Sequence, residues 1–135
     1  MDVTEKKFDE AELQRFESLG DNCEFGLVLR DLGSENSGIF RWALSNVVAT
    51  SSAIASSFDG LYQRPNIVPH SKIMVRDLAS GIAYHTELKS ELTDDGLKFT
   101  KTEQDWEETY CKELEKFLYL KKKFMQRLSE PSTIF

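Results

Sequence analysis

The residues of this 135-residue chain best suited to chemistry are two cysteines and two histidines. Cys23 follows a polar turn in which Asp21 and Asn22 are both good helix N-caps, because their side-chain oxygens accept the free amide groups of a first helical turn. An apolar stripe follows and ends at Gly33, so we expect a helix that begins at Cys23. A helix start stabilises a thiolate, which favours a nucleophilic Cys23. The alternative is a buried cysteine that only fills space.

A cysteine hydrolase also needs an imidazole that takes the thiol proton and a group that orients the imidazole. His85 lies in a segment, residues 82–86, whose alternation predicts a strand with His85 on one face and Tyr84 on the other. We expect His85 to act as the general base; a structural, hydrogen-bonded histidine is the alternative. Asp77, expected opposite His85 in a hairpin, and Glu87, two residues along the same face, are candidates for the orienting group.

Three segments carry a resemblance to a known family: SLGDNCE at 18–24, LR at 29–30 and IFRWA at 39–43. They resemble a bacterial family, the DUF1796 group, whose members share an SLG-x-x-C opening and are labelled papain-like cysteine peptidases. The resemblance continues through 75–85 and covers most of the chain, from about Phe16 to Phe135. It implies a cysteine peptidase with Cys23 as nucleophile, and it favours Asp77 as the orienting group.

Two residues depart from the pattern of that family. Arg41 stands where its members often have Asp, and Ile39 where they often have Pro. If the family's Asp takes part in catalysis, this chain lacks that group and is an inactive copy. A further alternative is a non-catalytic recognition or scaffold domain of a larger bacterial protein linked to surface polysaccharide. The turn with Gly20 and Asn22 is then structural or binds a small anion at the helix start, whereas in a hydrolase Asn22 could donate to an oxyanion.

No metal or cofactor pattern accompanies these residues. The sequence has no C-x-x-C or H-x-x-x-H pair and no glycine-rich nucleotide loop, and the spacing gives no support to a zinc site, so we expect neither a metal nor a cofactor. His70, between proline and serine, is predicted to be a solvated loop residue. Cys111 is predicted to be buried in a helix core. Trp42 and Trp106 are predicted to be core or groove walls.

Charge and composition exclude several classes of protein. The formal net charge is −6, which disfavours binding to nucleic acid because phosphate contacts need concentrated Lys and Arg. No apolar run approaches the roughly 20 residues of a membrane span, and the polar start lacks the core of a signal peptide. Two distant cysteines without an export signal indicate reduced thiols and a cytoplasmic protein. A peptide or a glycan-linked molecule is the substrate class we expect.

The patterns of the whole chain predict one α/β or α+β domain over residues 1–135, with a short sheet flanked by helices. We expect helices at 46–58 and 102–128, the second long and amphipathic, and strands at 72–77, 82–86 and 97–100. The segment 61–71, with two prolines, is predicted to be a loop, and 39–44 to plug one end of the core. Residues 133–135 are predicted to begin a strand. We therefore expect this sequence to be the N-terminal part of a longer chain, or a truncated product.

Overall fold

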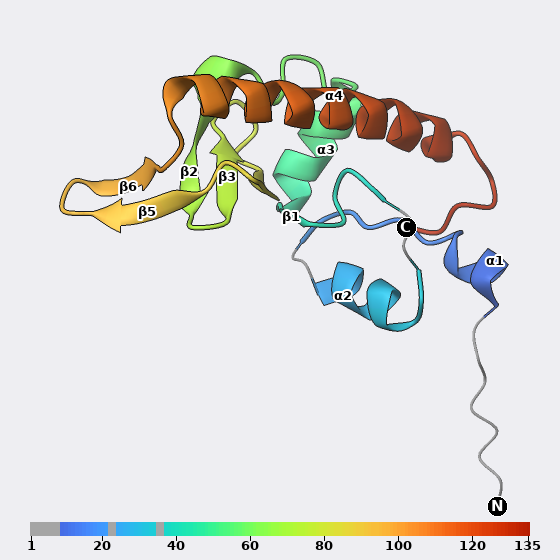
Figure 1. Cartoon of the computed structure of the whole chain (residues 1–135). Helices are drawn as coiled ribbons and strands as arrows, with labels where there is room; N and C mark the ends of the chain where they lie inside the picture. The colour runs from blue at the N-terminus through green and yellow to red at the C-terminus, as the bar shows by residue number, and fades with distance from the viewer. Residues whose placement is uncertain (1–8, 22–23, 35–36) are drawn as a thin grey trace, which may run out of the picture.

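A long helix lies across a small antiparallel sheet, and two short helices lie at the opposite end of the molecule (Figure 1). This computed structural model describes residues 9–21, 24–34 and 37–135. Its helices are α1 (Glu10–Leu13), α2 (Glu24–Asp31), α3 (Val47–Ala55) and α4 (Glu103–Leu128), with a 3-10 turn η1 at Arg64–Asn66. Its strands are β1 (Ala43–Leu44), β2 (Ile67–Ser71), β3 (Met74–Asp77), β4 (Ala83–His85), β5 (Ser90–Thr93) and β6 (Gly96–Phe99). The predicted α+β class with a long C-terminal helix is confirmed.

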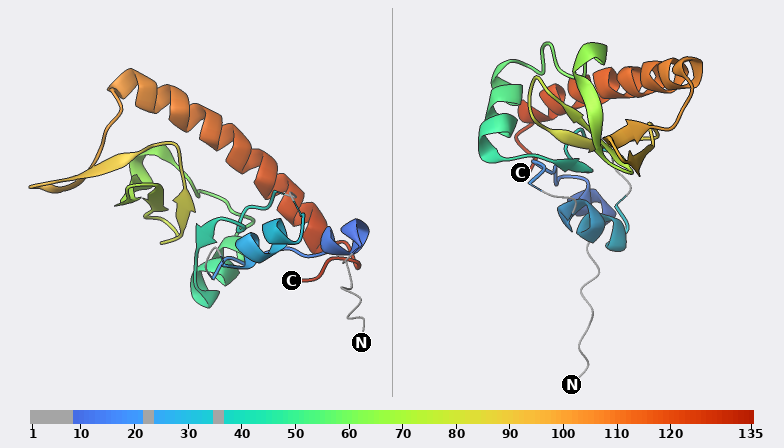
Figure 2. Two further views of the ribbon diagram at one scale, coloured as in Figure 1. Left: turned by 60° about the horizontal axis from the view of Figure 1, so that its bottom comes forward. Right: turned by 90° about the vertical axis from the view of Figure 1, so that its left-hand side faces the viewer.

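The main sheet has four antiparallel strands in the order β1-β4-β3-β2. Strands β3 and β4 form a hairpin in which Met74 lies opposite His85, and Val75 opposite Tyr84. Val75, Ile82 and Tyr84 are buried and point into the core, as the alternation of the sequence predicts. The second sheet is the hairpin β5–β6, which lies beside β2 and projects from one end of the molecule (Figure 2).

Strand β2 corrects the prediction of a loop over 61–71. Residues 67–71 pair with β3 although Pro69 lies among them, with a shift of register between Pro69 and Ser71. Proline lacks only the amide donor, and β2 is the edge strand of its sheet, where that donor has no partner to meet. Pro69 therefore marks the edge of the sheet and not a break in it, whereas Pro65 lies in the turn η1.

Two helices begin at side-chain caps. The hydroxyl of Thr102, the first residue of the predicted helix, accepts the amide of Asp105 at the start of α4. Helix α3 begins one residue later than expected, because Asn46 is its cap and not its first helical residue. The Asn46 side chain accepts the Ala49 amide at 2.8 Å. Asparagine is a favoured cap residue, because its short side chain reaches the free amides of the first turn.

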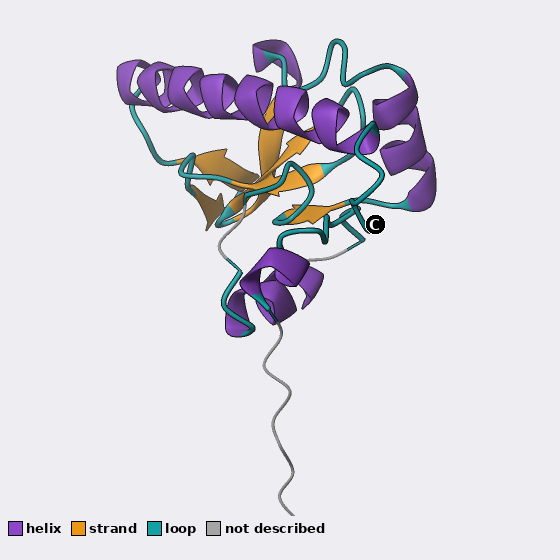
Figure 3. Ribbon diagram, turned by 90° about the vertical axis from the view of Figure 1, so that its right-hand side faces the viewer, coloured by secondary structure: helices purple, strands orange, loops and turns teal. Residues whose placement is uncertain are grey.

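Helix α4 covers the sheet with an aromatic stripe. Tyr110, Phe117 and Phe124 recur every seven residues and are buried. About two helical turns separate each from the next, so all three point to the same side of α4, toward the core. Figure 3 shows α4 lying across the strands. Phe124 packs edge-on against Phe40 at 5.3 Å and Phe58 at 5.5 Å between ring centroids. Phe40 is fully buried, which confirms that the segment 39–44 fills one end of the core.

The two terminal segments meet in a single parallel β-bridge between Phe16 and Ile134. Beside it, Glu17 and Arg127 form an ion pair of 2.7 Å, with both side chains largely buried. Burial raises the pKa of Glu17, and the positive charge of Arg127 opposes this shift. The strand start predicted at 133–135 is thus a bridge that ties the C-terminal segment to the N-terminal one. In the described ranges, no helix is both long and apolar enough to cross a bilayer.

Candidate functional site

The turn predicted to carry the nucleophile is described only in part. Asn22 and Cys23 lie outside the described residues, so their roles as oxyanion donor and nucleophile stay predictions. Gly20 is described, with φ of +78°, and its carbonyl accepts the Ser45 amide at 2.6 Å. A Cβ on Gly20 would lie 2.9 Å from that of Phe40. Close packing and a left-handed backbone therefore both require glycine here.

A shallow hollow lies beside the start of α2. It is lined by residues of the preceding turn and of the first helical turns: Ser18, Leu19, Gly20, Asp21, Glu24, Phe25 and Val28. Neither His85 nor Asp77 lines it. The described residues that flank position 23 therefore bring no imidazole into this hollow.

Asp77 does not lie opposite His85, and that prediction is wrong. The register pairs His85 with Met74, three residues before Asp77, and an odd spacing along a strand places the two side chains on opposite faces. The buried Asp77 carboxylate instead accepts the hydroxyl of Ser80 at 2.7 Å and the amide of Ala79 at 3.2 Å. These bonds close the β3–β4 turn, so the structure gives Asp77 a role in the fold.

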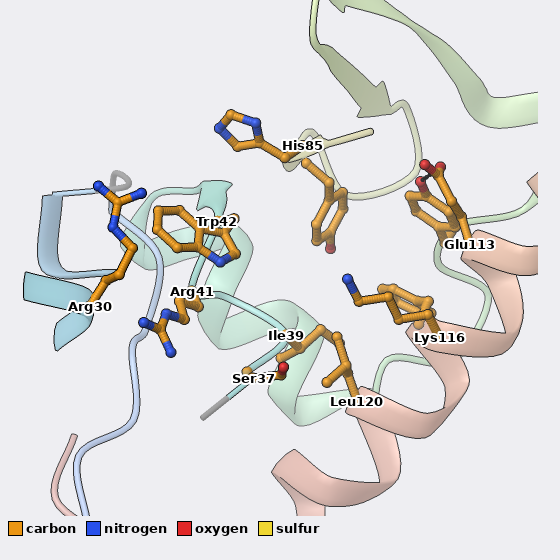
Figure 4. Close-up of a pocket in the computed structure, with 13 residues that line it drawn as sticks. Arg30, Ser37, Ile39, Arg41, Trp42, His85, Glu113, Lys116 and Leu120 are labelled. Carbon is orange, nitrogen blue, oxygen red and sulfur yellow. Dashed lines mark hydrogen bonds between the residues drawn. The ribbon is translucent and has the colours of Figure 1, made fainter. Parts of the chain in front are cut away.

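The alternative carboxylate, Glu87, forms an exposed ion pair with Lys89 at 3.8 Å. His85 is the last residue of β4 and is exposed, on the face opposite Tyr84 as predicted. Its ring lies edge-on to the indole of Trp42, with 6.3 Å between centroids. Figure 4 shows the imidazole at the rim of a cavity, directed away from the centre. Neither candidate carboxylate therefore orients His85 in this arrangement.

The cavity beside His85 has a volume of about 340 Å³, which lies in the range of small-molecule sites. Five parts of the chain form it: the end of α2, the segment 37–42, Tyr62 before η1, strand β4 and the middle of α4. Its lining residues are Arg30, Ser37, Gly38, Ile39, Arg41, Trp42, Tyr62, Tyr84, His85, Glu113, Lys116, Phe117 and Leu120. Apolar, aromatic and cationic side chains therefore meet in one small space.

Two guanidinium groups lie over the indole of Trp42 on one side of the cavity. The Arg41 group is 5.4 Å from the ring centroid and that of Arg30 is 6.0 Å from it. Arg41 is buried and donates to the carbonyl of Ser34 at 2.6 Å. Gly26 of α2 lies so close that a Cβ there would be 2.5 Å from the Arg41 carbonyl oxygen. Helix α2 thereby fixes a buried positive charge beside the indole.

The opposite side of the cavity is held by Glu113. Its carboxylate accepts the hydroxyls of Tyr62 and Thr86, each at 2.8 Å, and the amide of Glu87 at 2.7 Å. Tyr62 adopts a φ of +57°, uncommon for a bulky residue, and stacks on Phe117 at 5.1 Å. Burial and the nearby Glu113 raise the pKa of Tyr62. Several contacts thus hold this wall in one arrangement.

Tyr84 forms part of the aromatic wall and is more than nine-tenths buried. Its hydroxyl is buried and has no hydrogen-bond partner among the described residues. Burial, and to a smaller extent the charge of Asp77, raise the pKa of Tyr84. The side chain is therefore a protonated phenol with a donor that the protein leaves unused.

The remaining candidates are distant from this cavity. Cys111 is exposed on α4, so the prediction that it is buried is wrong. It follows the buried Tyr110, and consecutive helical residues point about 100° apart, which turns the thiol away from the core. His70 is half-buried on β2, where its ring contacts the Arg76 guanidinium at 3.1 Å. The described residues hold no group of three or more potential metal ligands from His, Cys, Asp and Glu.

Sequence patterns had indicated only part of the cavity. Trp42 was predicted to be a core or groove wall, and Arg41 stood out as a departure from the family pattern. Lys116 and Glu113 gave no signal, because charged residues along an amphipathic helix are usually solvated. No family model, curated protein or solved structure matches this chain.

Proposed function

We propose that this domain is a recognition module that binds a small anionic molecule with an apolar body in the cavity beside Trp42. The observation that carries the proposal is the charge of the lining. Three cationic side chains, Arg30, Arg41 and Lys116, line the cavity beside one carboxylate, Glu113, whereas the chain as a whole has a formal net charge of −6. A local excess of cations on an acidic protein attracts anions specifically to this place.

The cavity also offers groups that suit the rest of such a ligand. Ile39 and Leu120 form an apolar part of the lining, and the hydrocarbon part of a ligand that packs against them is removed from water. Lys116 is exposed and makes no hydrogen bond or ion pair within the described ranges, so its ammonium group is available. Arg41 is buried, where charges interact through less water and therefore more strongly.

Intrinsic fluorescence tests the proposal directly. The chain has two tryptophans, so a Trp106→Phe variant reports on Trp42 alone. We expect benzoate to change the Trp42 emission with a saturable dependence on concentration, and benzylammonium, a cation of the same body, to leave it unchanged. Lys116→Gln weakens benzoate binding, whereas Lys112→Gln, an exposed lysine of α4 outside the lining, does not. Equal binding of the cation, or no saturation with the anion, contradicts the proposal.

A second candidate is a Cys–His hydrolase, favoured by the SLG-x-x-C resemblance and by the exposure of His85. Its test is the pH dependence of iodoacetamide labelling of Cys23, in a Cys111→Ser background because Cys111 is exposed. An alkylation pKa below that of a free thiol, which His85→Ala raises, supports a hydrolase. A pKa near that of a free thiol, unmoved by the substitution, counts against it.

A further inference from the structure

One cation of the lining points into the cavity. In Figure 4 the Lys116 amine is directed toward the centre of the cavity. The side chain is exposed, and it makes no hydrogen bond or ion pair in the described part of the chain. Its ammonium group is therefore free to turn toward a ligand, and its charge is not compensated by another side chain there.

The two arginines of the lining do not face the centre. In Figure 4 both guanidinium groups lie beyond the indole of Trp42 and not toward the middle of the cavity. Arg30 is paired with Asp31 at 3.9 Å. Arg41 donates to the carbonyl oxygen of Ser34 at 2.6 Å. A ligand in the centre therefore contacts neither guanidinium group, and the lysine is the cation that it meets.

The hydroxyl of Tyr84 is a second donor in the same lining. Tyr84 is more than nine-tenths buried, and its hydroxyl has no hydrogen-bond partner among the described residues. An unsatisfied buried hydroxyl is a cost that proteins usually avoid. Contact between this hydroxyl and a ligand requires a lining side chain to shift, and Lys116 is free to do so. A ligand oxygen that replaces the missing partner would then accept from Tyr84.

The carboxylate of the lining limits how much negative charge a ligand can carry. The Glu113 carboxylate accepts hydrogen bonds from Tyr62, Thr86 and Glu87, which keep it ionised at the margin of the cavity in Figure 4. One negative charge on a ligand is compensated by the ammonium group of Lys116. A second would find no further cation that faces the centre and would lie near a fixed carboxylate. The lining therefore favours a monoanion over a dianion.

We propose that the ligand is a small monocarboxylic acid, bound as its carboxylate between the ammonium group of Lys116 and the hydroxyl of Tyr84. This inference rests on the proposed anion-binding function and narrows it to one class of ligand. A carboxylate has one negative charge and two acceptor oxygens, which match one ammonium group and one hydroxyl. Ile39 and Leu120 offer apolar surface to its hydrocarbon part, and the volume of about 340 Å³ suits a small molecule.

The test compares ligands that share one body and differ in the charged group. Isothermal titration calorimetry at pH 8 and fixed ionic strength measures phenylacetate, a monoanion, against phenyl phosphate, which is a dianion at that pH. In both ligands one atom joins the ring to the charged group. We expect phenylacetate to bind about tenfold more tightly, because the second charge of the phosphate leaves water without a cation that faces it.

Variants of the two donors test where the carboxylate lies. We expect Lys116→Gln and Tyr84→Phe each to weaken phenylacetate binding by about tenfold, whereas Lys112→Gln and Tyr119→Phe, both exposed on α4, leave it unchanged. Tyr84→Phe removes a hydroxyl without a partner, so the urea midpoint of the free protein should stay the same or rise. Tyr110→Phe is the matched control, because that hydroxyl donates to a backbone carbonyl at 2.8 Å, and it should lower the midpoint.

The outcomes separate this inference from the proposed function. Phenyl phosphate binding as tightly as phenylacetate overturns the carboxylate class and leaves anion binding in place. An unchanged affinity in Tyr84→Phe, or a greater loss in Arg30→Gln than in Lys116→Gln, overturns the placement of the carboxylate. Tighter binding of an N-acetylated tripeptide that ends in phenylalanine assigns the site to the C-terminus of a peptide and overturns the small-molecule ligand. No saturable binding of either anion overturns both proposals.

Discussion

Removal of the Glu113 carboxylate is the sharpest test of how the cavity wall is held. The variant Glu113→Ala leaves three donors without their acceptor: the hydroxyls of Tyr62 and Thr86 and the amide of Glu87. The Glu87 residue is exposed, so water can replace the carboxylate there. Tyr62 and Thr86 are buried at 3% and 6% exposure, so their hydroxyls lose their partner without replacement.

The expected loss follows from those two buried hydroxyls. A hydrogen bond to a charged group contributes about 1.5 to 3 kcal/mol. Partial relaxation around the smaller side chain reduces the sum, so we expect the free energy of unfolding to fall by about 3 kcal/mol. For a chain of this length that corresponds to a drop in Tm of about 10 °C. Glu113→Gln keeps one carbonyl acceptor and is expected to lose about half as much.

Urea denaturation measures the change, with Glu115→Ala as the matched control because that residue is an exposed glutamate of the same helix. The control is expected to stay within about 0.5 kcal/mol of the natural chain. A double-mutant cycle adds Tyr62→Phe, which we expect to cost less in the Glu113→Ala background than alone. The reasoning is refuted if Glu113→Ala matches its control, or if Tyr62→Phe costs the same in both backgrounds.

Three further predictions concern the supports of the cavity and the ends of the chain. Gly26→Ala forces α2 away from the Arg41 carbonyl, so we expect a loss of about 1 to 3 kcal/mol by urea denaturation and weaker anion binding. Asp77→Ala leaves the Ser80 hydroxyl and the turn without an acceptor and is expected to cost about 1 to 3 kcal/mol, with anion affinity unchanged in calorimetry. Burial raises the pKa of Glu17 above its ordinary value of 4.5, so the folded state binds the proton more tightly. The unfolding free energy of the natural chain relative to Glu17→Gln should therefore fall as pH rises through the interval just above 4.5, and a rise would contradict this.

The strongly periodic elements of this fold could be predicted from the sequence. The apolar stripe of α4 and the alternation of residues around Tyr84 can be read from short stretches of sequence, because buried residues recur there at the period of a helix or a strand. Strand β2 could not be predicted, because a proline is acceptable only at an edge and the order of strands is not a local property. The position of Asp77 relative to His85 depends on the pairing register of β3 and β4, and neither residue determines that register. The cavity depended on tertiary packing, since α2, β4 and α4 contribute to it from distant parts of the chain.

Arg41 is the residue at which the two proposed functions diverge. The family that the sequence resembles often has Asp at the corresponding position. An Asp there would remove one cation from the lining of the cavity and add a second carboxylate to that of Glu113. Arginine changes the local charge by two, and it does so from a buried position where charge acts strongly. The same departure that weakens the inference of a peptidase therefore supports the proposed binding of an anion, so Arg41 is more informative about this chain than the motif it shares with the family.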